Sequence, residues 1–209
     1  MLLSAPYGKL RREEIVDTLW SGVDQLAAHQ SLRAAIGALR RAFREPTWIR
    51  VAGPTVTLDL PGDSRDDIAF EARARASLSA GNIAEMFAAL DLYGGSYLPD
   101  DRYNDWTGYR RLALSDLRRS LLLGVSASAT KLGRQSDVTN WLRQLLSDDP
   151  CDEPAARALM KLLLEDGRRV DAVRTYKQLE QALRLEIEVD PEPETTKVLG
   201  SLHIVTQAK

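Results

Sequence analysis

SLRAAIGALRRAFRE, residues 31–45, combines an apolar helix face with a run of arginines. At 3.6 residues per turn the apolar side chains fall on one side, and they are Leu32, Ile36, Leu39 and Phe43. Another side carries basic residues around a glycine, and they are Arg33, Gly37, Arg40 and Arg44, with Arg41 beside them. We expect Ser31 to cap the start of this helix, and the helix to stop before Pro46.

A row of guanidinium groups of this length fits the major groove of DNA. Eleven residues of helix rise about 16 Å, and the groove is about 12 Å wide. Gly37 costs about 0.5–1 kcal/mol relative to alanine in a helix interior, which indicates close approach of either a ligand or a neighbouring helix. Arginine-rich faces are also typical of ordinary solvated helices, so the flanking segments must decide between the two interpretations.

The flanking segments follow the order of a winged helix-turn-helix. Leu10–Trp20 predicts a first helix, and residues 48–52 and 55–60 predict two strands of a β-hairpin. In such domains the second helix enters the major groove while the hairpin, or wing, contacts the flanking backbone. We therefore predict DNA-binding residues on the helix and the hairpin, namely Arg33, Gly37, Arg40, Arg41, Arg44, Arg50 and Thr55.

The sequence pattern after residue 62 predicts a series of consecutive helices. Gly133-Arg134 recurs 34 residues later as Gly167-Arg168, and 34 residues is the period of tetratricopeptide helix pairs, which stack around a concave groove. The predicted fold class is mainly α, with a partial winged helix-turn-helix at 1–62 followed by a tetratricopeptide-like all-α repeat domain at 63–209. The helices expected in this second domain span residues 67–80, 82–93, 103 or 106–132, 137–147, 154–165, 170–187 and 194–202.

Charge is spread unevenly along the 209 residues. The formal net charge is −2, yet residues 29–50 contain five arginines and one glutamate. Residues 1–62 contain eight Lys/Arg and six Asp/Glu, whereas the remainder is net negative. The positive field is therefore concentrated in the first domain, and the acidic second domain is expected to offer a protein-binding surface.

Other classes of site find no support in the sequence. The single cysteine, Cys151, excludes an internal disulfide framework and a multi-thiolate zinc site. Neither a glycine-rich phosphate loop nor EF-hand spacing occurs. We expect no catalytic residues, no metal site, no cofactor and no enzyme activity. Because no apolar run approaches the ~18 residues of a membrane span and no signal peptide is evident, we expect a cytoplasmic protein with no membrane partner.

Several motifs resemble a known family. REEIVDTLW followed by SLRAAIGALRRAF and a short hairpin resembles the DNA-binding region of the SARP family of bacterial antibiotic-regulatory activators. The remainder resembles the bacterial transcriptional activator domain of that family, most specifically in DGRRVDAVRTYKQLEQALRLEIEVDPEPET. The resemblance implies a transcriptional activator whose winged helix binds double-stranded promoter DNA. It also implies that the helical-repeat domain supports activation, homodimerisation or contact with RNA polymerase.

The sequence departs from that family at its start. Family members normally begin with a small β-sheet and a first helix, but only Met1–Lys9 precede the matching region here, so the chain resembles an N-terminally shortened member. Arg11 stands where the family usually has a Ser or Thr helix cap. The alternative function is a tetratricopeptide-like protein-interaction adaptor, with a degenerate winged helix that does not bind DNA.

Overall fold

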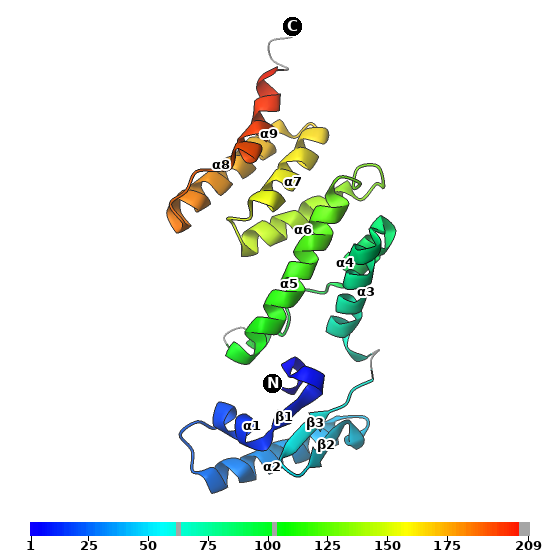
Figure 1. Ribbon diagram of the computed structural model, residues 1–209, viewed down its shortest axis with the longest axis vertical. Helices are drawn as coiled ribbons and strands as arrows, with labels where there is room; N and C mark the ends of the chain where they lie inside the picture. Colours follow the sequence, from blue (N-terminus) through cyan, green and yellow to red (C-terminus); the bar gives the residue numbers. More distant parts are fainter. Residues whose placement is uncertain (62–63, 102–103, 205–209) are drawn as a thin grey trace. The chain divides into compact units, whose positions relative to one another are not determined.

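The computed structural model forms two compact units (Figure 1). The first consists of Met1–Ala69 with Gly95–Leu114, and the second of Phe70–Gly94 with the chain from Ser115 onward. The domain division predicted from the sequence, between residues 62 and 63, lies outside the described residues. The structure describes residues 1–61, 64–101 and 104–204, with side chains up to residue 200.

Helices dominate the described chain, and the predicted fold class, mainly α with a winged helix and a helical repeat, is confirmed. The long helix expected to reach residue 132 ends earlier, at Ser126, and the expected alternative start at Tyr103 lies outside the described residues. The α-helices are α1 (Arg12–Leu19), α2 (Gln25–Ala42), α3 (Asp66–Ala80), α4 (Ile83–Leu92), α5 (Asp105–Ser126), α6 (Gln135–Asp148), α7 (Glu153–Glu165), α8 (Arg169–Glu186) and α9 (Pro193–Ile204).

The first unit contains a three-stranded antiparallel sheet of β1 (Lys9–Arg11), β2 (Ile49–Ala52) and β3 (Thr55–Leu58), in the order β1-β3-β2. The predicted hairpin of β2 and β3 is confirmed. Strand β1 was not predicted, because Leu10 was assigned to the first helix, which begins instead at Arg12. Three residues are too few to show strand alternation, so pairing with β3 decides their conformation.

Gly8 leads the chain into β1 at a point where no side chain fits. Its φ is +65°, and a Cβ atom there would lie 2.3 Å from the carbonyl oxygen of Leu58. A backbone atom cannot move aside as a flexible side chain would. The close approach of Gly8 to β3 therefore requires glycine.

Helix α2 is displaced along the sequence from its predicted range. It begins at Gln25 because the Asp24 carboxylate accepts hydrogen bonds from the amides of Leu26 and Ala27, at 3.0 and 3.2 Å. The predicted cap, Ser31, is wrong, since Ser31 lies inside the helix and donates its hydroxyl to the carbonyl of Ala27. The helix ends at Ala42, because the next residue adopts an extended conformation.

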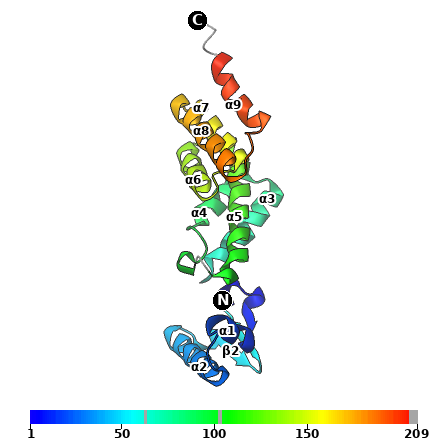
Figure 2. The same cartoon turned by 90° about the vertical axis from the view of Figure 1, so that its left-hand side faces the viewer.

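The core of the first unit lies between the sheet and helices α1 and α2, which contact it in both views (Figure 1 and Figure 2). Trp20 and Phe43 are partly buried against it, Phe43 as predicted, and the Phe43 ring contacts that of Trp48 with ring centroids 5.8 Å apart. Leu19, the last residue of α1, is 50% exposed. The fully buried members are Ile15, Val16, Ala28, Leu32, Ile36, Ile49 and Val56.

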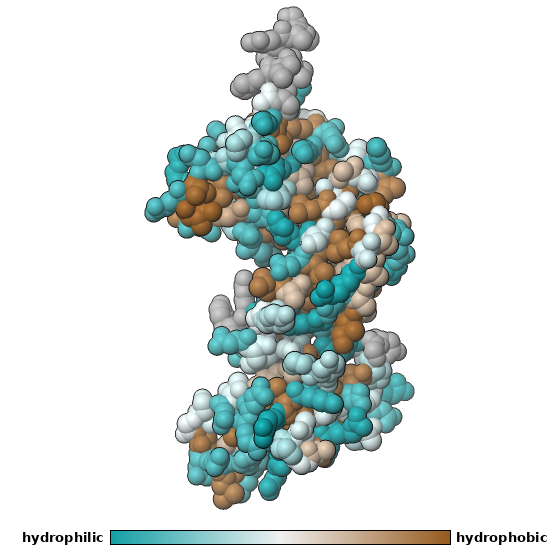
Figure 3. All heavy atoms as spheres, in the orientation of Figure 1, coloured by the Kyte–Doolittle hydropathy of each residue, from teal (hydrophilic) through white to brown (hydrophobic). Residues whose placement is uncertain are grey.

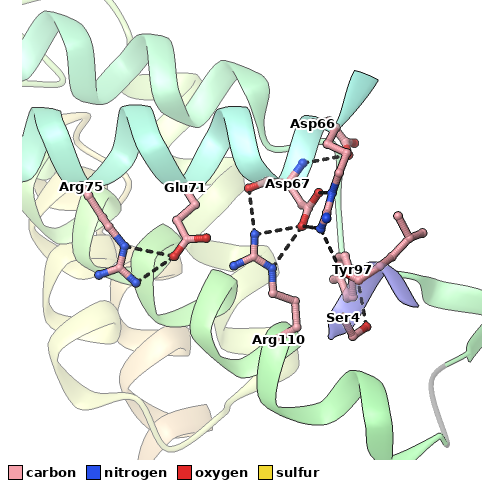
Figure 4. A network of polar contacts seen from close by, with 9 residues as sticks. Ser4, Asp66, Asp67, Glu71, Arg75, Tyr97 and Arg110 are labelled. Carbon is pink, nitrogen blue, oxygen red and sulfur yellow. Dashed lines mark hydrogen bonds and ion pairs between the residues drawn. The ribbon is translucent and has the colours of Figure 1, made fainter. Parts of the chain in front are cut away.

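A buried ion-pair network fixes the segment Gly95–Leu114 to the rest of the first unit (Figure 4). The Asp67 carboxylate, whose side chain is only 8% exposed, accepts from Arg110 and Arg65, each at 2.8 Å. Arg65 also donates to the carbonyl of Leu3. Burial by itself would raise the pKa of Asp67, but the hydrogen bonds and charges of the two arginines outweigh it and hold the pKa below its ordinary value.

The second unit shows the predicted repeat in its backbone geometry. Gly133 and Gly167 both have positive φ, +67° and +72°, Gly133 at the end of the turns that follow α5 and Gly167 shortly after α7. The arginine after each glycine donates its amide to the carbonyl five residues earlier, as in a Schellman motif. Each of these arginines then precedes a helix, α6 or α8, and pairs with the aspartate three residues further on. The 34-residue period therefore repeats both the turn and its ion pair.

Helix α7 is the most buried element of the second unit. It contacts α6, α8 and α9, and it lies beside α6 and α8 in both views (Figure 1 and Figure 2). Leu159, Met160 and Leu163 are almost fully buried on it. Since helix pairs of this kind cannot bury their apolar faces alone, stacking of neighbours stabilises the repeat.

Candidate nucleic-acid interface

Helix α2 carries arginines but no acidic side chains. Its 18 residues include Arg33, Arg40 and Arg41 and no carboxylate. The buried residues Ala28, Leu32 and Ile36 follow one another at four-residue spacing and fix the side of the helix that faces the core. Arg33 and Arg41 therefore project from the side turned to solvent.

Three of the predicted arginines have free guanidinium groups. Arg33, Arg41 and Arg44 are exposed, and none of them lies within ion-pair distance of a carboxylate in the described part of the chain. Arg44 lies beyond the end of α2, so its predicted place on the helix, eleven residues after Arg33, is wrong. Free guanidinium groups retain all five of their N–H donors for a ligand.

Gly37 lies on this same side of α2, four residues after Arg33 and four before Arg41. A Cβ atom at Gly37 would meet only the Nη1 atom of Arg41, at 3.5 Å, with no other helix within 4 Å. Packing against a neighbouring helix of this chain therefore does not account for the glycine. The other interpretation of Gly37, close approach of the helix backbone to a ligand, stays a prediction.

Arg40 has a partner within the fold. Its Nε and Nη2 atoms donate to the carbonyl oxygen of Ile49, at 3.1 and 3.0 Å. This pair of hydrogen bonds joins the C-terminal end of α2 to the first residue of β2. The sequence pattern does not indicate it, because the two residues meet only after the hairpin has folded back.

The predicted wing residues lie on another surface. The register sets Arg50 opposite Thr57, and Thr57 opposite Lys9, so these side chains share one face of the sheet. Thr55 shares this face, whereas the buried Val56 points to the core. Because α2 packs on the core side, the structure does not bring Arg50 and Thr55 together with Arg33 and Arg41.

The outer face of the sheet is itself basic. Lys9 and Arg11 are exposed there, beside Arg50, whose guanidinium donates to the Asp59 carboxylate. Arg11 lies 3.9 Å from Glu13, at the limit of an ion pair. Lys9 and Arg11 share this face because they flank Leu10 in β1, where alternate side chains point to the same side of the sheet.

The surface seen in Figure 3 is mostly hydrophilic, with hydrophobic patches between. Within the side chains that the structure describes, no group of three or more His, Cys, Asp or Glu residues is arranged to hold a metal ion. None of the described helices combines the length and the apolarity that crossing a membrane requires.

Together the fold and the basic helix define a class of protein, in which a helix-turn-helix with a β-hairpin is joined to a unit of stacked helix pairs. Residues 64–202 match the family described as the bacterial transcriptional activator domain. The chain belongs to this family, and the SARP-type regulator predicted from its motifs is confirmed. It is thus a member of a family of transcriptional activators.

A solved structure shares the fold over the whole chain. It is that of Mycobacterium tuberculosis EmbR in complex with a low-affinity phosphopeptide, with a TM-score of 0.72 and 21% sequence identity. The alignment covers 100% of this chain but only 58% of the EmbR chain. Among curated proteins no significant match is found.

Proposed function

We propose that this protein is a transcriptional activator that binds double-stranded DNA by placing α2 in the major groove. The observation that carries the proposal is the solvent-facing side of α2, where Arg33, Gly37 and Arg41 lie in a row with no carboxylate partner in the described chain. Arginine is suited to both guanine edges and phosphates. The glycine between the two arginines allows the helix backbone to approach the bases.

The other predicted residues receive narrower roles. Arg44, beyond the end of α2, is placed to contact phosphate. Arg40 acts as a positioning residue, because its guanidinium holds α2 against β2. Arg50 and Thr55, on the outer face of the sheet, are proposed as contacts to DNA backbone that lies beyond the groove occupied by α2.

Fluorescence anisotropy with a labelled duplex of mixed sequence tests the proposal. The double variant Arg33→Ala/Arg41→Ala should bind at least about 30-fold more weakly, since each of the two arginine contacts contributes about 1–3 kcal/mol. The matched control is Arg169→Ala, which removes an exposed arginine from the second unit. Equal affinity of the double variant and the wild-type protein would contradict the proposal.

The helical-repeat unit is proposed to act on other proteins, through contact with RNA polymerase or by homodimerisation, in the cytoplasm. Sedimentation equilibrium of the full chain tests dimerisation, and pull-down with purified RNA polymerase tests the other contact. If the protein binds no duplex at low salt, the interaction adaptor replaces the DNA-binding regulator as its function.

A further inference from the structure

A pocket in the second unit has the composition of a ligand site, and the proposed DNA contacts do not involve it. It encloses about 670 Å³ between α6, α7 and α8. Cavities of about 300–1,000 Å³ are typical of binding sites. We propose that this pocket binds an acidic peptide segment of a partner protein.

Part of the pocket lining is apolar. Leu159 and Leu179 line the pocket and are each 2% exposed, while Leu146 is only partly buried. Pro150, which is exposed, also belongs to this apolar part. An apolar side chain of a ligand would bury its surface against these four residues.

The charged part of the lining is mostly cationic. It includes Arg143, Arg168 and Arg174 but only one carboxylate, that of Asp171. Asp171 already accepts from Arg168 and Arg174, at 2.6 and 3.3 Å, and the hydrogen bond from Arg168, with the nearby arginine charges, lowers the pKa of Asp171. The three guanidinium groups therefore keep a surplus of two positive charges.

Arg143 is the pocket arginine whose guanidinium group is most available to a ligand. It is exposed, and within the described chain it forms no ion pair, although its charge acts on Asp171. Arg174 is also exposed, with 66% of its side chain accessible, and its contact with Asp171 is long. Both can turn toward a carboxylate of a ligand without breaking a buried interaction.

The shape of the pocket favours a chain-like ligand. Its residues on and before α8 run from Arg168 to Leu179, a rise of about 16 Å, which equals about five residues of extended peptide. The Gln178 amide on α8 and the Ser147 hydroxyl on α6 also line the pocket and can form hydrogen bonds with the backbone of such a peptide. The Thr175 hydroxyl donates to the Asp171 carbonyl and can still accept one. Charge complementarity then selects carboxylates in its sequence.

Selection from a random dodecapeptide display library on the immobilised full chain tests the inference. The enriched peptides should contain Asp or Glu next to an apolar residue. A synthetic copy of the strongest peptide should bind the variant Arg143→Gln/Arg174→Gln about tenfold or more weakly, yet bind Arg169→Gln, an exposed arginine of α8 outside the pocket, like the wild type.

Failure of enrichment, enrichment of neutral or basic peptides, or equal binding to the pocket variant would each overturn the inference. Thermal melting checks that the exposed substitutions leave the fold intact. The same pocket variant should keep the wild-type affinity for duplex DNA. A loss of DNA affinity instead would assign these arginines to nucleic acid and also overturn the peptide site.

Discussion

Two arginines of α2, Arg33 and Arg41, differ from the carboxylate-paired arginines of the second unit in what their guanidinium groups contact. In the second unit, Arg119 pairs with the buried Asp152, and Arg134 pairs with Asp91 and Asp137. The hydrogen bonds to these two aspartates raise the pKa of Arg134 above its ordinary value. On α2, Arg33 and Arg41 have no carboxylate partner in the described chain.

This difference indicates two roles for arginine in the protein, one in stabilising the fold and one in binding a ligand. A guanidinium group paired with a buried carboxylate stabilises the fold, because either group left alone would be desolvated without compensation. A guanidinium group in solvent contributes little to the fold. Its retained donors and charge are then available for a ligand, so substitution should change binding more than stability.

The largest effect is expected from breaking a paired arginine in the second unit. Asp152→Ala should lower the free energy of unfolding by about 3–5 kcal/mol, since the Asp152 side chain is 1% exposed and pairs with Arg119. The carboxylate also caps α7 through the amide of Ala155. Urea denaturation of the full chain measures the change, with Arg33→Ala as the control that should stay within about 0.5 kcal/mol. Similar losses of unfolding free energy in the two variants would contradict the distinction between paired and unpaired arginines.

A comparable effect, with a pH signature, is expected at Asp67 in the first unit. Asp67→Asn should lower the free energy of unfolding by about 3 kcal/mol at neutral pH, because Arg65 and Arg110 would lose their shared carboxylate. The folded-state pKa of Asp67 lies below the unfolded one. Its contribution is therefore full above the unfolded pKa of about 4 and is lost as the pH falls through the folded value.

Urea denaturation at a series of pH values tests the Asp67 prediction. The gap between the wild-type protein and Asp67→Asn should close as the pH falls below about 4. A gap that stays constant into acid would show that Asp67 does not stabilise the fold through its charge.

A smaller effect, on binding alone, is expected for a single unpaired arginine. Arg41→Ala should weaken duplex binding by about 1–3 kcal/mol and leave the urea midpoint almost unchanged. Anisotropy and denaturation on the same preparation measure both quantities. A lowered midpoint with unchanged DNA affinity would place Arg41 among the structural arginines.

The smallest effect is expected at Gly37. Gly37→Ala should raise the free energy of unfolding by about 0.5–1 kcal/mol, since only the side chain of Arg41 lies near the new methyl group. The same variant should weaken DNA binding if the backbone approaches the bases there. Equal or tighter binding by the more stable variant would show that Gly37 makes no close approach to DNA.

The sequence predicted those features that depend on local signals. The helix pairs follow from apolar periodicity and from the glycines at 133 and 167, and the hairpin follows from β-branched runs around Gly53-Pro54. The start of α2 was also encoded locally, by Asp24. It was assigned to Ser31 because serine also caps helices and the apolar pattern is clearest after it.

Features that depend on contacts between distant residues were missed. Strand β1 exists because β3 offers it a partner, and Arg40 is held by a carbonyl that the hairpin brings back to α2. The pocket arginines, Arg143 and Arg174, lie 31 residues apart and face one cavity only after α6 and α8 have packed on α7. Periodicity assigns a residue to a helix face but does not identify what lies opposite that face.

The most direct test of the central claim is the salt dependence of duplex binding by the wild-type protein and by Arg33→Ala/Arg41→Ala. We predict tight binding by the wild type at low salt, with a steep negative slope of log affinity against log salt concentration. The slope of the double variant should be shallower by about one for each phosphate that its side chains no longer reach. Identical slopes and affinities, or no binding by the wild-type protein at low salt, would contradict the account.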